Sequence, residues 1–136
     1  MITRLISCRR GVVSLEAAIV FPVLIMLVMG AMEFALLLFT YNSMQAATRE
    51  VTRQLAVNFT TPGDVEAAVR ARLPNWSRDD AAVVVAQSAP ANPETNVFNV
   101  VVTMPALDAT PLPFFIRARE PWDLRTEVTM KQELPL

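Results

Sequence analysis

The sequence predicts an α+β fold, in which a long N-terminal helix precedes a small antiparallel β-sheet of about three strands and one short helix. Three observations support this prediction. Residues 17–39 form an almost unbroken apolar run. The chain then continues without glycine or proline up to Pro62, and its apolar residues recur every three or four positions, which is typical of one helix face. The remaining sequence holds short alternating or β-branched runs separated by prolines, which indicates strands.

The composition narrows the function classes. Of the 136 residues, 53% are hydrophobic and 18% are charged, and the excess of apolar residues lies in one run. This favours a membrane segment over a large core. The formal net charge of −1 does not indicate nucleic-acid binding. With no histidine and one cysteine, the chain lacks the residues for Ser-His-Asp, Cys-His and zinc sites.

Residues 12–40 are predicted to be a transmembrane helix, because about 20 apolar residues are enough to cross a bilayer. Arg9 and Arg10 precede the run and act as an orientation signal, since basic residues favour the cytoplasmic side. We therefore expect a single-pass membrane protein, with its N-terminus in the cytoplasm and its C-terminal part outside.

Two alternatives to a membrane anchor fit the sequence poorly. A cleaved secretory signal has a shorter apolar region that ends at a small-residue site, and this run continues into a further helix. The segment before Cys8 resembles a lipoprotein signal, but only seven residues precede the cysteine and two arginines follow it.

Residues 41–59 are predicted to continue the same helix in amphipathic form, from about Ser14 to Asn58 in total. This part needs an apolar partner surface, which the C-terminal region has to supply. The predicted apolar stripe consists of Met44, Ala47 or Thr48, Val51, Leu55 and Phe59.

Residues 60–136 are predicted to form the small outer domain. Asp64 is placed to cap a short helix that reaches about Leu73, and Pro74 ends it. The apolar patch 112–116 lies in a proline-rich excursion, and it can either lie near the membrane surface or cover the sheet. The predicted strands are 82–86, 97–104 and 122–132, with Leu124, Thr126, Val128 and Met130 on one face of the last strand.

Glu16 is an unusual residue at the start of an apolar run. One interpretation is that it lies at the headgroup level, near the helix N-terminus that favours anions. Another follows from the preceding residues: basic side chains, then Gly11, then Val12, with the glutamate fifth after the glycine. This pattern resembles a type IV-like prepilin signal, which implies cleavage between Gly11 and Val12 by a prepilin peptidase. The freed amine of a neighbouring subunit would then neutralise Glu16.

The wider N-terminal segment resembles the TadE-like family of tight-adherence (Flp) pilus biogenesis. The resemblance rests on Arg10-Gly11, Glu16, Pro22 and the Gly30-x-x-Glu33-Phe34 element. It implies a pilus assembly or adhesion component, a minor pilin or pseudopilin of a type IVc-like secretion system. The implied partners are the bilayer, the prepilin peptidase, other pilins or pseudopilins, and inner-membrane platform proteins. Val12 stands where many type IV pilins have phenylalanine, so N-terminal methylation is not implied.

Glu33 is a second acidic residue within the apolar run. It can lie near the outer interface or stay protonated there. Alternatively it pairs with a polar or basic group of another membrane subunit, which Gly30 would allow to approach closely.

The sequence contains no motif for catalysis or cofactor binding. Its three glycines do not form a phosphate-binding loop, and its carboxylates lack the spacing of a calcium loop. We therefore expect a non-enzyme without catalytic residues, metal, cofactor, small-molecule substrate or nucleic-acid partner. In the pilin hypothesis, residues 1–11 are a leader-like segment. The alternative function is an uncleaved single-pass anchor whose outer domain binds partners in an envelope complex.

Overall fold

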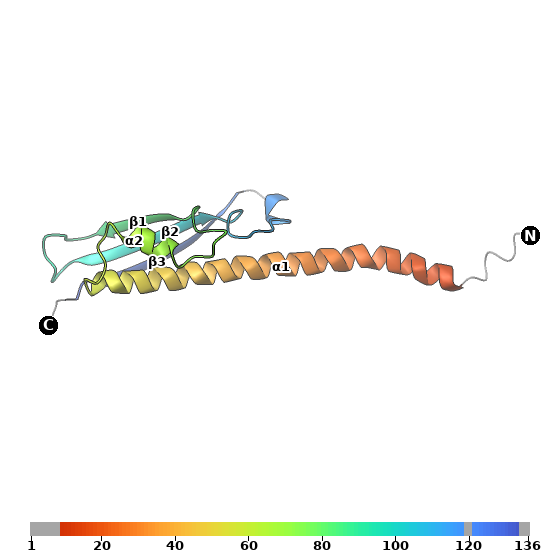
Figure 1. The fold of residues 1–136 in the computed structure, drawn as a ribbon, viewed down its shortest axis with the longest axis horizontal. Helices are drawn as coiled ribbons and strands as arrows, with labels where there is room; N and C mark the ends of the chain where they lie inside the picture. Colours follow the sequence, from red (N-terminus) through yellow and green to blue (C-terminus); the bar gives the residue numbers. More distant parts are fainter. Residues whose placement is uncertain (1–8, 119–120, 134–136) are drawn as a thin grey trace, which may run out of the picture. The chain divides into compact units, whose positions relative to one another are not determined.

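The computed structural model describes residues 9–118 and 121–133, and it has the predicted α+β fold. The elements follow in the order α1, α2, β1, β2, η1 and β3, where η1 is a short 3₁₀ helix (Figure 1). The chain divides into two compact units, Met1–Met32 and Glu33–Leu136, so the boundary falls inside α1. We call the second unit the domain. The first eight residues of the predicted leader, including Cys8, lie outside the described residues.

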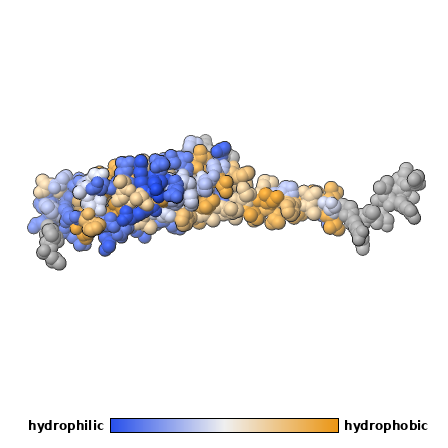
Figure 2. Space-filling model, viewed as in Figure 1, coloured by the Kyte–Doolittle hydropathy of each residue, from blue (hydrophilic) through white to orange (hydrophobic). Residues whose placement is uncertain are grey.

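Helix α1 spans Arg9–Ala56, so it begins before the predicted Ser14 and ends before the predicted Asn58. Pro22 lies inside α1. Apolar helices that cross a membrane tolerate an internal proline. Every side chain from Val13 to Val28 is exposed, and most are apolar (Figure 2). Among the described residues, one helix is long and apolar enough to cross a membrane, and this helix is α1.

The part of α1 in the domain buries one stripe and exposes the opposite face. The predicted stripe from Met44 to Leu55 is confirmed, and it extends toward the N-terminus as far as Glu33. Phe59 was predicted to belong to it, and this prediction is wrong, because Phe59 lies beyond the helix end and is 80% exposed. The buried positions of α1 are Glu33, Leu37, Thr40, Met44, Ala47, Thr48, Val51, Thr52, Leu55 and Ala56.

Asn58 explains why the helix ends before Phe59. It adopts a left-handed conformation with φ of 61°, which asparagine tolerates better than most residues. The Phe59 N–H then donates back to the Gln54 carbonyl at 2.8 Å. The end of α1 is also tied to the C-terminal segment, because the Glu133 N–H donates to the Ala56 carbonyl at 2.8 Å.

Three antiparallel strands form the sheet, in the order β1-β2-β3. Their bounds are β1 Ala82–Gln87, β2 Val97–Pro105 and β3 Asp123–Lys131, close to the predicted strands. Burial alternates along β2, whose inward side chains Phe98, Val100, Val102 and Met104 are all buried. The predicted inner face of β3 is confirmed as well, since its even-numbered residues from Leu124 are the less exposed ones.

Helix α2 spans Val65–Arg70 and is shorter than predicted. Asp64 occupies the position before it, but the predicted side-chain cap is wrong, because Asp64 makes no side-chain capping bond. Its carboxylate instead accepts a 2.6 Å hydrogen bond from the Thr61 hydroxyl, since Asp64 itself has a helical backbone conformation. The apolar residues Val65 and Val69 are fully buried.

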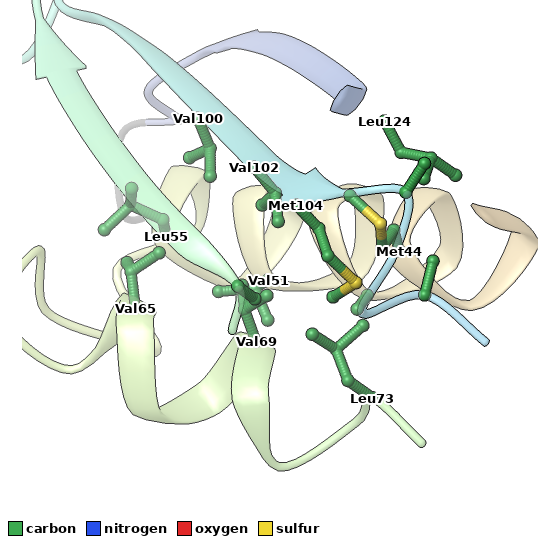
Figure 3. Packing of buried hydrophobic residues seen from close by; sticks show 14 of the residues in the cluster. Met44, Val51, Leu55, Val65, Val69, Leu73, Val100, Val102, Met104 and Leu124 are labelled. Atoms are coloured by element: carbon green, nitrogen blue, oxygen red, sulfur yellow. The ribbon is translucent and has the colours of Figure 1, made fainter. Parts of the chain in front are cut away.

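One hydrophobic core holds these elements together. Figure 3 shows side chains from α1, α2, β2 and β3 that point toward one another. Met44 and Val51 of α1, Val69 of α2 and Met104 of β2 are each 0% exposed. The sheet and α2 therefore supply the apolar partner surface that the amphipathic part of α1 requires.

Candidate functional site

Glu33 is a buried carboxylate at the first residue of the domain, with 4% of its surface exposed. Its Oε2 accepts a 2.7 Å hydrogen bond from the backbone N–H of Phe115. Its Oε1 accepts a 2.9 Å hydrogen bond from the backbone N–H of Ile116. Two consecutive amides of one loop therefore bind both oxygens of one carboxylate.

The local backbone explains why these amides need an acceptor. Ile116 opens the 3₁₀ helix η1, which spans Ile116–Ala118. The first N–H groups of a helix have no acceptor within that helix. A carboxylate is a strong acceptor, and hydrogen bonds to a charged group are shorter and stronger than neutral ones. The pairing satisfies both partners, so Glu33 can occupy a buried position that continues an apolar stripe.

A second contact joins α1 to the same loop. The Thr40 hydroxyl donates a 2.7 Å hydrogen bond to the Ala109 carbonyl, and Thr40 is fully buried. The Trp76 indole N–H donates to the same carbonyl at 3.3 Å. The Trp76 ring also lies 6.1 Å from the ring of Phe39, measured between centroids.

These contacts define a segment that we call the strap, residues 106–117, which leaves β2 and follows α1. The two attachment points on α1, Thr40 and Glu33, are separated by two helical turns, or about 10 Å. Ala109 is bound at the first point and Phe115 at the second. The strap therefore runs along the domain part of α1 from Thr40 toward Glu33, the first residue of the domain.

Residues 11–53 match the sequence model of one protein family. That family is the TadE-like proteins. The predicted resemblance is confirmed over this segment, which includes Glu16 and Glu33 and ends within the amphipathic part of α1. No curated protein and no solved structure matches the chain significantly.

The sheet and the strap lie outside the TadE-like segment. The match ends at residue 53, whereas the strap begins at residue 106. The contact between Glu33 and Phe115 therefore joins the family segment to a part of the chain that the family model does not cover.

The predicted processing signal lies at the start of α1. The Gly11–Val12 bond falls within the helix, which begins at Arg9. Arg10 belongs to the same first turns. The TadE-like match begins at Gly11, so the predicted cleavage bond lies between the first two residues of the matched segment.

Glu16 lies on the apolar unit and is exposed. Within residues 9–118 and 121–133, no hydrogen bond or ion pair of its side chain is found. Its predicted pairing with the amine of a neighbouring subunit stays a prediction. Gly30 is half-buried and lies one turn before Glu33.

The structure gives Glu33 partners within its own chain, whereas the sequence left open a partner on another subunit. The predicted contact with a second membrane subunit stays a prediction. The spacing of the stripe could have indicated the buried side of Glu33, because Glu33, Leu37, Thr40 and Met44 follow one another at intervals of three or four. No sequence signal identifies the Phe115 and Ile116 amides as donors.

Among the residues that the structure describes, no cluster of three or more acidic or cysteine side chains is placed to hold a metal ion. The Asp79-Asp80 pair is exposed in a loop. The structure thus presents the Glu33 end of the domain as the place where a buried carboxyl side chain, α1 and the strap meet.

Proposed function

We propose that this chain is a minor pilin or pseudopilin of a bacterial tight-adherence pilus system, anchored in the inner membrane by the first part of α1. The TadE-like match over residues 11–53 is the observation that carries the proposal, because it suggests a pilus-associated protein. The N-terminus would be cytoplasmic and the domain periplasmic, since Arg9 and Arg10 precede the apolar run.

The exposed apolar unit supports the membrane anchor. From Val13 to Met32, about 20 residues span about 30 Å, which equals the thickness of the hydrocarbon core. Side chains such as Ile19 and Leu27 are each 66% exposed, and lipid would cover them. Burial of apolar surface in lipid would stabilise this segment, because its side chains from Val13 to Val28 are exposed among the residues that the structure describes.

A prepilin peptidase would cut between Gly11 and Val12, and Glu16 would then be the fifth residue of the mature chain. The new amine at Val12 gives the carboxylate of a neighbouring subunit a partner of opposite charge. A carboxylate in an apolar environment requires such a partner. The partners of the mature protein would be other pilins or pseudopilins and platform proteins of the machinery.

Mass spectrometry of the intact protein tests the processing step. Co-expression with an active prepilin peptidase should remove residues 1–11, a loss of about 1 kDa, as for other removed targeting segments. Gly11→Ala should block the removal of residues 1–11. Gly30→Ala changes the same residue type within the membrane segment, and residues 1–11 should still be removed. A chain that still begins at Met1 beside an active peptidase would contradict processing and favour the uncleaved anchor.

A further inference from the structure

Large apolar side chains are exposed at the end of the domain where Glu33 lies. On the strap, Phe114 is 63% exposed, and Leu112 and Phe115 are 45% and 44% exposed. On α1, Phe34 directly follows Glu33 and is 62% exposed. An exposed apolar patch of this kind indicates a contact surface. We call Leu112, Phe114 and Phe115 the strap tip.

Hydrogen bonds hold the strap tip at one level of α1. Glu33 binds the backbone of Phe115 and Ile116, so the tip lies beside the first turn of α1 in the domain. Phe114 and Phe115 have ring centroids 6.5 Å apart. The backbone of the strap tip is therefore bound to α1, while its aromatic side chains are exposed.

The covalent chain places this level directly after the apolar unit. Glu33 follows Met32, the last residue of a segment that matches the hydrocarbon thickness, at about 30 Å. The headgroup region extends about 5–7 Å further on each side of the hydrocarbon. One helical turn beyond Met32 therefore lies within that region, and the strap tip is bound at this turn.

We propose that the strap tip inserts into the membrane interface on the periplasmic side, where Phe114, Phe115 and Leu112 contact lipid. This inference rests on the proposed membrane anchoring and adds a second lipid contact made by the domain itself. Phenylalanine and leucine commonly form the apolar face of protein segments that lie in the membrane interface. Both Glu33 oxygens already accept hydrogen bonds, so this carboxylate can lie at the interface with less loss of hydration.

The residues beside the tip fit a lipid headgroup layer. A pocket of about 190 Å³ opens next to it, lined in part by Ile116, Arg117 and Trp122. A guanidinium matches phosphate geometry, and tryptophan is common at headgroup level. An apolar tip with a cation and an indole beside it favours a lipid surface over an entirely apolar protein groove.

The opposite end of the domain has a different character. There Asn58 accepts a hydrogen bond from the Gln132 side chain, and the buried Asn96 donates to Gln132 at 2.9 Å. Figure 2 shows hydrophilic residues over much of the domain face in view. Phe59 is exposed at this polar end, and it provides a control of the same residue type as Phe114.

The test uses the full chain with Cys8→Ser, reconstituted in phospholipid nanodiscs, with the fluorophore NBD on one introduced cysteine. Three positions are compared: Phe114→Cys at the tip, Phe59→Cys at the polar end, and Leu24→Cys in the apolar unit. We expect blue-shifted emission and quenching by brominated lipid at 24 and 114. We expect water-like emission and no lipid quenching at 59.

The possible outcomes separate the two proposals. A lipid-exposed probe at 24 with a water-exposed probe at 114 would overturn the tip inference and leave the anchor standing. Water-like emission at both positions would overturn the anchor, and the tip inference with it. A probe at 114 that is blue-shifted without lipid quenching would indicate a protein contact, such as a second copy of the chain, and would overturn the lipid contact. Equal lipid quenching at 59 and 114 would also overturn it.

Discussion

Glu33 and Phe115 are 82 positions apart in the sequence, and a 2.7 Å hydrogen bond joins the Glu33 carboxylate to the Phe115 backbone N–H. A second bond, from Ile116, completes the pair. Because Glu33 is the first residue of the domain, this contact fixes the strap to the turn of α1 that follows the apolar unit. The Glu33 side chain therefore holds the backbone of the exposed strap tip beside this turn.

Replacement of Glu33 by glutamine should destabilise the domain. The glutamine amide keeps one acceptor oxygen, but its NH₂ group would face an N–H group of the strap and leave it without an acceptor. A buried N–H group that loses its acceptor lowers the free energy of unfolding by about 1–3 kcal/mol. Urea unfolding of the detergent-solubilised protein, followed by tryptophan fluorescence, measures this difference.

Glu50→Gln is the matched control for this substitution. Glu50 lies on the same helix, and its side chain is 43% exposed and bonded to Gln54 and Arg53. Exposed ion pairs contribute little to protein stability, so Glu50→Gln should change the free energy of unfolding by less than about 0.5 kcal/mol. Equal effects of the two substitutions would contradict the assigned role of Glu33.

The contrast between α1 and the strap shows what sequence could predict here. The stripe from Met44 to Leu55 and the alternation along β2 repeat with the periods of a helix and a strand, so both could be read from residue types alone. The strap has no such period. Its attachment uses the backbone amides of Phe115 and Ile116, and every non-proline residue carries an amide, so no residue type indicates it.

The candidate site was therefore predicted in part. The sequence singles out Glu33, because a carboxylate in an apolar run is costly, but it leaves open an interfacial position, a protonated side chain or a partner on another subunit. The partner itself lies on the strap, far away in sequence, and only the fold brings the two together. The prediction that Phe59 belongs to the apolar stripe is wrong for a local reason. Asn58 adopts a left-handed conformation and ends the helix without the glycine that commonly marks such an end.

Met44→Ala should be among the most damaging core substitutions. Met44 is 0% exposed and lies on α1 within the core shared with the sheet and α2. Truncation leaves a cavity, which costs about 2–5 kcal/mol for a buried methionine. Urea unfolding in detergent measures the loss. Met26→Ala removes the same side chain at a position that is 54% exposed, so it should have little effect on domain unfolding.

Low pH should weaken the outer face of the sheet through Glu127. The Asn99 amide donates to this carboxylate at 2.7 Å and Arg125 at 3.0 Å, and these bonds hold the pKa of Glu127 below its ordinary value of 4.5. Because the pKa is lower in the folded state, the stabilisation is fully present above the unfolded pKa. It is lost as the pH falls through the folded value.

Glu127→Gln removes this contribution at every pH. The free energy of unfolding of the original chain should exceed that of the variant at neutral pH, and the gap should narrow below pH 4.5. Parallel denaturant titrations of both proteins across the acid range check this. A gap that stays constant down to strongly acid pH would show that the carboxylate charge is not the cause.

Asn58 provides a prediction on how α1 ends, because its backbone and its side chain can be tested separately. Its φ of 61° suits glycine, and its side chain joins the C-terminal segment through Gln132 and the Glu133 carbonyl. Asn58→Gly removes the side-chain bonds but keeps the conformation accessible, whereas Asn58→Ala removes the same bonds and adds left-handed strain. The alanine variant should therefore be about 1 kcal/mol less stable than the glycine variant. Thermal and urea unfolding of the pair measure this difference. Equal stability of the two variants would mean that the helix end rearranges when the side chain is lost, and that the bonds to the C-terminal segment, more than the backbone, fix the left-handed turn.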